Sequence, residues 1–189
     1  MVKNRIKLKN IAFIISLIAI AVGWRIINHN YQFAPNLELV TAISVLAAIT
    51  MGWRIALIVP IVTMIISDII IGNSLIFIFT WGSFAIIGLS AVVLRKLNDK
   101  PKLQIISSVG FAAAGTFLFF IVTNFGVWLQ GWYPMTWAGL VDCFVMAIPF
   151  YRTMLIGNLI LVPTVVIVWQ LVYSRQKDSS LVIDSLVGK

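Results

Sequence analysis

The chain has 189 residues, of which 61% are hydrophobic and only 11% are charged. Roughly a quarter of a soluble domain is charged, so this composition excludes a soluble domain, and its hydrophobicity excludes a disordered chain. A single-domain polytopic membrane protein remains, and the net charge of +8 should be judged by where the basic residues lie rather than as a sign of nucleic-acid binding.

The sequence contains six apolar runs that are candidates for membrane-spanning helices. They cover residues 11–27, 37–51, 55–71, 75–94, 103–127 and 154–172. A spanning helix needs about 20 mainly apolar residues, and every run except the second reaches this range with its flanks. We therefore predict an all-α membrane protein with six transmembrane helices in one domain, residues 1–173, followed by a loosely ordered polar cytoplasmic tail, residues 174–189.

The distribution of Lys and Arg indicates the orientation. If the N-terminus is cytoplasmic and the chain crosses six times, 12 of the 14 basic residues lie inside, and only Arg25 and Arg152 lie outside. This is the bias expected of cytoplasmic segments, so both termini are predicted to be cytoplasmic. Without the short second span, the basic segment 95–102 would move to the outer side, which is why we count that span.

The N-terminus has a second interpretation. Its basic start, its apolar run and the sequence Ala19-Ile20-Ala21 also resemble a cleavable signal peptide. The apolar run continues to Ile27, which is long for a signal peptide and favours a retained helix.

Polar residues from separate predicted helices fall at one depth, near the outer surface. Ionisable residues within a span are costly and usually face the bundle interior or water. Asp68 lies inside an apolar run and needs a cation, for which Arg25 and Arg152 are the candidates on that side. Two interpretations stay open: interfacial residues with a structural Arg–Asp pair, or a ligand pocket.

Aromatic residues also gather on the predicted outer side, where Trp128 and Trp132 lie. Aromatic walls with a few convergent polar groups are typical of small-molecule pockets. The candidate ligand-binding residues are Arg25, Asn36, Asp68, Asn124, Trp128, Trp132, Arg152 and Asn158. Because two cations share this level with one carboxylate, we expect a planar or partly aromatic ligand with an acidic or hydrogen-bond-accepting group.

The longest predicted connection is the outer loop of residues 126–151. Within it, residues 136–148 are moderately apolar but too few to span a membrane. We expect this segment to lie along the surface or to dip in as a cap.

The sequence lacks the motifs that catalysis or nucleotide binding would need. It has no nucleophile elbow, no zinc-protease motif and no phosphate-binding loop. Cys143 and His29 are each the single residue of their type, so an internal disulfide and a multi-histidine metal site are excluded. We predict no enzyme activity, no cofactor and no metal site, and any energy for transport must come from a partner or an ion gradient.

Several stretches resemble an uncharacterised bacterial integral membrane family that is related to the substrate-binding S components of energy-coupling factor transporters. They are residues 33–36 (FAPN), residues 53–60 running on to Ser67-Asp68, and, most specifically, residues 119–159. The resemblance implies an S-component-like bundle in the bacterial inner membrane, with a vitamin-like small molecule captured at the outer face.

The resemblance also implies partners: a transmembrane coupling subunit, which Ala19 and Gly23 on the first helix would contact, and two cytoplasmic ATPases. Asn158 departs from the pattern, because an acidic residue is expected there. The alternatives are a stand-alone carrier or a structural membrane protein without ATPase partners, and, with least support, a membrane enzyme.

Overall fold

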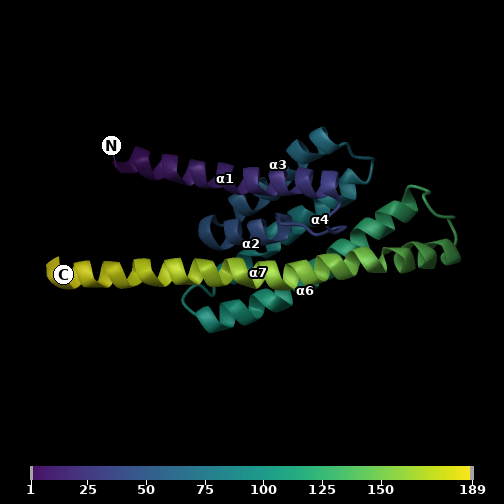
Figure 1. The fold of residues 1–189 in the computed structure, drawn as a ribbon. Helices are drawn as coiled ribbons and strands as arrows, with labels where there is room; N and C mark the ends of the chain where they lie inside the picture. The colour runs from purple at the N-terminus through teal and green to yellow at the C-terminus, as the bar shows by residue number, and fades with distance from the viewer. Residues whose placement is uncertain (1, 188–189) are drawn as a thin grey trace.

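A computed structural model describes residues 2–187 of the chain, with side chains over residues 8–175. Within these residues every regular element is a helix and there is no strand. The helices are α1 (Val2–Tyr31), α2 (Val40–Met51), α3 (Trp53–Ile71), α4 (Phe77–Ser90), α5 (Val92–Arg95), α6 (Pro101–Leu129) and α7 (Trp137–Val187). Figure 1 shows them as an elongated bundle.

The prediction of an all-helical protein with several long apolar helices is confirmed. Each of the six apolar runs forms a helix over most of its length, and five spans in the described part of the chain are long and apolar enough to cross a membrane. The fourth run forms α4 and α5 in succession. These features are those of a multi-pass membrane protein.

Helix α2 is the exception in length, and its burial explains how so short an apolar helix is accommodated. At 1.5 Å per residue its 12 residues extend about 18 Å, less than the thickness of the hydrocarbon core of about 30 Å. Nine of these residues are buried, so α2 lies inside the bundle rather than against lipid. A single residue, Gly52, joins it to α3 with a φ of +87°, a conformation that favours glycine.

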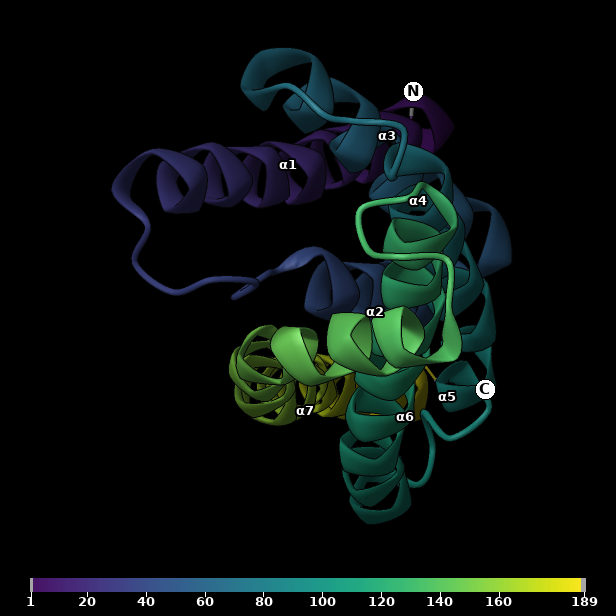
Figure 2. The same cartoon turned by 90° about the vertical axis from the view of Figure 1, so that its right-hand side faces the viewer.

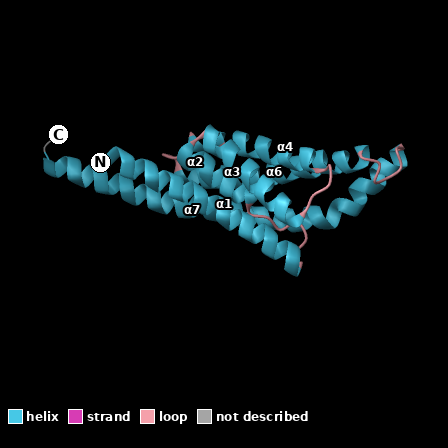
Figure 3. Ribbon diagram, turned by 90° about the horizontal axis from the view of Figure 1, so that it is seen from above, coloured by secondary structure: helices cyan, strands magenta, loops and turns pink. Residues whose placement is uncertain are grey.

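Both chain termini lie at the same end of the bundle, as Figures 1 and 3 show. The connections 32–39 and 130–136 lie at the opposite end. The predicted loose tail instead continues α7 as a helix to Val187. The predicted cytoplasmic basic residues Lys3, Arg5, Lys7, Lys177 and Lys189 have side chains outside the described residues.

The predicted outer loop of residues 126–151 is wrong in its extent. Helix α6 continues to Leu129, and only residues 130–136 connect it to α7. Figure 2 shows the first turns of α7 (light green) lying across the end of the bundle, while the rest of the helix is seen nearly end-on. Pro149 lies inside α7 in this region, and a proline removes an intrahelical hydrogen bond and bends a helix.

The largest core cluster surrounds α2. Val45 and Ile49 of α2 are fully buried against Leu94 of α5 and Val162 and Val166 of α7. Helix α1 lies at the edge of this arrangement and is the least buried of the five long spans. The bundle is therefore organised around α2, with α1 presenting much of its surface outward.

Candidate ligand-binding site

A cavity of about 380 Å³ opens at the end of the bundle opposite the termini. Its walls come from the C-terminal halves of α1 and α3, from α4, α6 and α7, and from two connections, residues 32–39 and residues 72–76. Polar groups line it on the side of α1 and α3, and Phe84, Phe119 and Phe150 line it from α4, α6 and α7. Such a mixture of apolar walls and a few convergent polar groups is typical of small-molecule sites.

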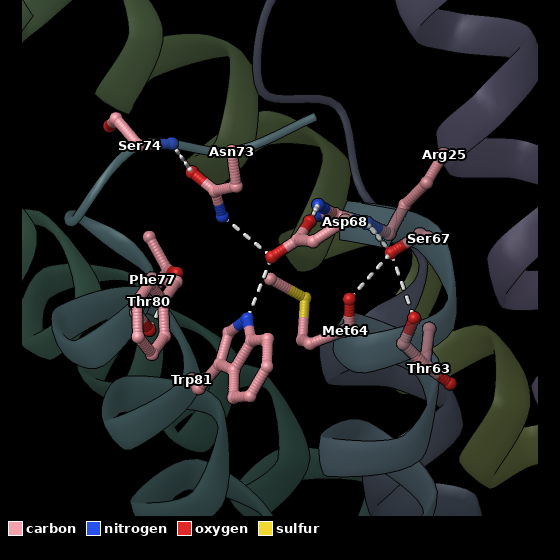
Figure 4. Close-up of polar contacts among 10 residues, drawn as sticks. All are labelled: Arg25, Thr63, Met64, Ser67, Asp68, Asn73, Ser74, Phe77, Thr80 and Trp81. Atoms are coloured by element: carbon pink, nitrogen blue, oxygen red, sulfur yellow. Dashed lines mark hydrogen bonds and ion pairs between the residues drawn. The ribbon is translucent and has the colours of Figure 1, made fainter. Parts of the chain in front are cut away.

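Asp68 and Arg25 form an ion pair at the wall of this cavity. The Arg25 Nη2 lies 2.6 Å from Asp68 Oδ1, and Arg25 Nε donates to Ser67 Oγ at 2.7 Å. Asp68 Oδ2 accepts from Asn73 Nδ2 at 2.6 Å and from Trp81 Nε1 at 2.7 Å (Figure 4). The carboxylate thus joins α1, α3, α4 and the connection between α3 and α4, and its charge is balanced within the protein.

The connection 32–39 forms the rim of the cavity and is tied back to α1. The Asn28 side chain donates to the carbonyl oxygens of Ala34 and Leu37 and accepts from the Ala34 backbone N–H. Trp24 Nε1 also donates to the Leu37 carbonyl oxygen at 2.9 Å. Asn36 adopts a positive φ of 60°, which asparagine tolerates better than most residues. The rim is therefore a defined structure rather than a free loop.

Glu38 faces the cavity at the start of α2 and is only 7% exposed. Its Oε2 accepts from the Thr41 backbone N–H at 2.8 Å, which caps one of the free donors at the helix start. Its Oε1 has no hydrogen-bond partner among the described residues. Burial raises the pKa of the Glu38 carboxyl above its ordinary value of 4.5, although polar contacts with Thr41 and Asn158 oppose the rise.

Asn158 of α7 reaches the same carboxyl from the other side. It is fully buried, and its side chain lies beside that of Glu38. Its Nδ2 donates to Thr116 Oγ1 of α6 at 3.1 Å, whereas its Oδ1 has no partner in the described part of the chain. Asn158 thus connects α6 and α7 to the start of α2.

The structure brings together three of the eight predicted ligand-binding residues. Arg25, Asn36 and Asp68 line the cavity, and Asn158 lies behind it beside Glu38. Arg152 is exposed and is not among the lining residues. The role of each in ligand binding stays a prediction.

The remaining predicted residues lie toward the start of α7 and the connection 130–136. Asn124 donates to the Phe120 carbonyl oxygen within α6, and Trp128 Nε1 donates to the Pro134 carbonyl oxygen. Trp132 is 61% exposed. None of the three lines the cavity, and its aromatic wall is formed by phenylalanines instead.

The two predicted partner-binding residues lie on the outward surface of α1. Ala19 is exposed, and a Cβ added at Gly23 would meet no atom within 4 Å. At these two positions the surface of α1 is open, whereas Leu17 and Ala21 pack into the bundle.

Sequence reasoning missed Glu38, Asn28 and Asn73 as parts of this site. Glu38 is the single glutamate of the chain and stands at the start of the second apolar run, which is a signal that marks it. Asn28 and Asn73 stand near the ends of apolar runs, where asparagines are common in turns, and nothing in the sequence distinguishes them.

A family model matches residues 5–181, almost the whole chain. The chain belongs to DUF6580, a family of unknown function. No curated protein and no solved structure matches it. Membership of DUF6580 carries no activity with it, and the expected relation to S components stays a prediction.

Proposed function

We propose that this protein is the substrate-binding membrane subunit of an importer of the energy-coupling factor type, and that the substrate is a small molecule bound in the 380 Å³ cavity. The cavity is the observation that supports the proposal. It gathers hydrogen-bonding groups and aromatic rings from five helices and two connections within an otherwise apolar bundle. Polar groups in such a bundle are costly unless they are paired or used.

The proposed orientation has six crossings, both termini in the cytoplasm and the cavity at the outer face of a bacterial inner membrane. It is supported by the position of both termini at one end, together with the exposed basic residues Arg54, Arg95, Lys96 and Lys100. Basic residues collect on the cytoplasmic side. In this arrangement α2 crosses within the bundle, where its short length is shielded from lipid.

Native mass spectrometry of gently purified protein tests the binding function. We expect a co-purifying small molecule on the wild-type chain and on Ser90→Trp, whose site is exposed at the far end of α4. Thr80→Trp on the same helix places its ring in the cavity and should remove the adduct. A wild-type chain without any adduct, or an adduct that persists in Thr80→Trp, would contradict binding in this cavity.

Association with a transmembrane coupling subunit and two cytoplasmic ATPases forms the second part of the proposal. It is supported by the outward position of Ala19 and Gly23, because small residues allow close helix approach in lipid. The double variant Ala19→Leu, Gly23→Leu should fold and carry the adduct as the wild type does, but should lose co-purifying partner subunits. If the wild type co-purifies no ATPase, the protein acts as a stand-alone carrier or structural protein. If the double variant unfolds, the small residues serve its own bundle.

A further inference from the structure

Glu38 is among the residues that line the cavity, and its carboxyl group is only partly hydrogen-bonded. Its Oε2 accepts from the Thr41 backbone N–H, whereas Oε1 has no hydrogen-bond partner among the described residues. The Thr41 hydroxyl beside it is also buried and unpaired. A buried polar atom without a partner costs free energy comparable to a lost hydrogen bond, so this oxygen calls for a proton or a ligand.

The amide of Asn158 adds a second unsatisfied acceptor to this site. The Thr116 hydroxyl donates its one hydrogen to the Ala112 carbonyl oxygen at 2.8 Å, so it can only accept from Asn158. This fixes the amide with Nδ2 toward Thr116 and leaves Oδ1 as a buried acceptor without a partner. This second acceptor belongs to a side chain that lies beside Glu38. A donor group that enters here, from a ligand or from a protonated Glu38, would satisfy these acceptors.

The charges that face the cavity leave Glu38 as the one acid without a counter-charge among the described lining residues. Arg25 is committed to Asp68 and Ser67, and Asp68 accepts from Asn73 and Trp81 as well. His29 lies exposed at the rim. The residues that α4, α6 and α7 contribute to the lining are not titratable. A ligand that brings a positive charge would therefore meet an acid free to balance it.

The remaining walls indicate that this ligand is an organic cation rather than a metal ion. The described residues hold no group of three His, Cys, Asp or Glu that would bind a metal. The cavity is far larger than an ion, and Phe84, Phe119 and Phe150 form its apolar side. Aromatic faces attract ammonium groups and also pack against an apolar body.

We propose that the cavity binds a small organic ammonium compound and that Glu38 is the residue that balances its charge. This inference rests on the proposed function, because it names the class of ligand for the same cavity. As the ammonium group arrives, the Glu38 O–H bond breaks and its proton leaves to bulk water through the cavity mouth. The carboxylate keeps the electron pair, retains the hydrogen bond from Thr41 N–H and gains one from the Thr41 hydroxyl.

The positive charge of this ligand is opposite to the negative charge of the acidic group expected from the sequence. That expectation needed a cation without a counter-charge at the ligand, but Arg152 is not among the lining residues and the charge of Arg25 is balanced by Asp68. Burial raises the pKa of the Glu38 carboxyl, so this acid holds its proton to a higher pH than an exposed one until a cation balances its charge.

Isothermal titration of the full chain tests the proposal with three probes of similar size: 2-phenylethylamine, 2-phenylethanol and phenylacetate. The amine should bind at least about tenfold more tightly than the neutral or anionic probe, as expected for a charge-assisted contact. Titration in two buffers of different ionisation enthalpy should show about one proton released per amine bound.

Glu38→Gln should weaken amine binding at least about tenfold and abolish proton release. Asp142→Asn removes the same charge from an exposed position of α7 outside the cavity and should change neither. If Glu38→Gln does not fold, the pH dependence of amine binding by the wild-type protein tests the proposal instead. Its amine affinity should rise with pH by up to about tenfold per unit below the pKa of Glu38, and a flat profile without proton release would overturn the proposal.

The outcomes separate this inference from the proposed function. Equal or tighter binding of the alcohol or phenylacetate, unchanged amine binding by Glu38→Gln, or an anionic co-purifying molecule would overturn the ammonium proposal while binding in the cavity stands. A co-purifying cation that Glu38→Gln loses would support the proposal even if 2-phenylethylamine is too small to bind. Absence of both an adduct and probe binding would overturn both proposals.

Discussion

Asp68 illustrates how a single carboxylate can organise one end of this bundle. Its side chain is 5% exposed and accepts from Arg25, Asn73 and Trp81, which belong to three different parts of the chain. Every one of these donors would lose its partner if the carboxylate were removed. Asp68 therefore holds these parts of the chain together through polar contacts, even though it also lies at the wall of the cavity.

Replacing Asp68 with alanine should destabilise the protein strongly. Removing one partner of a buried ion pair typically costs about 3–5 kcal/mol, because the other charge stays buried and unpaired. Asp142→Ala, an exposed carboxylate in α7, is the control and should be nearly neutral. Unfolding by denaturant in mild detergent, followed by tryptophan fluorescence, measures both. Equal stability of the two variants would show that the Arg25–Asp68 pair does not hold α1 to α3.

Glu38 predicts a second measurable effect, on the pH dependence of stability. Because folding raises the pKa of this carboxyl above 4.5, ionising Glu38 opposes folding. The contribution of protonated Glu38 to the free energy of unfolding is complete below pH 4.5, the pKa of the unfolded chain. It is lost as the pH rises through the higher pKa of this carboxyl in the folded chain. Relative to Glu38→Gln, the free energy of unfolding of the wild type should fall with rising pH by at most about 1.4 kcal/mol per unit. Parallel pH profiles would be inconsistent with a raised pKa.

At the scale of elements, the close approach of α3 and α4 depends on Gly88. A Cβ added there would lie 2.2 Å from the Ala56 carbonyl oxygen, which belongs to the backbone of α3 and cannot move aside alone. Small residues at such crossings let helices pack closely in lipid. The two helices that carry Asp68 and Trp81 are thereby held at the separation that their hydrogen bond requires.

Gly88→Ala should push α3 and α4 apart and cost about 1–3 kcal/mol, as overpacking typically does. Gly82→Ala lies in the same helix, where an added Cβ meets nothing within 4 Å, so it should be neutral or stabilising by up to about 1 kcal/mol. Thermal unfolding of both variants in the same detergent provides the comparison. If the unfolding temperature of Gly88→Ala is equal to or higher than that of Gly82→Ala, the contact with Ala56 does not limit how closely α3 and α4 pack.

At the scale of the whole molecule, both ends of the chain and the connection 96–100 lie opposite the cavity. The proposed orientation predicts which loops an impermeant maleimide can reach. In a Cys143→Ser background, which removes the single cysteine, Met135→Cys should be labelled in intact cells. Lys100→Cys should be labelled only after the membrane is permeabilised. The reverse pattern would place the cavity on the cytoplasmic side.

The sequence by itself determined the class of protein and the positions of its helices. Long apolar runs have no stable alternative to helix in lipid, because their backbone groups must bond within the segment. The same hydropathy placed Arg25 and Asp68 at similar depths, so their pairing was among the expected interpretations. Hydropathy did not show that residues 137–148 are continuous with the last helix. An apolar segment of a dozen residues before Pro149 is equally consistent with a separate surface segment and with the first turns of a bent helix.

Only the tertiary structure decided which of the residues at that depth meet. Depth along a span follows from position in the sequence, but the direction in which a side chain points around its helix depends on how the helices are rotated and bent against one another. For this reason Trp132 and Arg152 fall outside the cavity while Phe84 lines it. Glu38 and Asn158 are 120 positions apart, and nothing in the sequence indicates that they meet. Their contact exists because α7 packs beside the start of α2. Among the described lining residues, the group without a counter-charge is therefore an acid, Glu38, rather than a base.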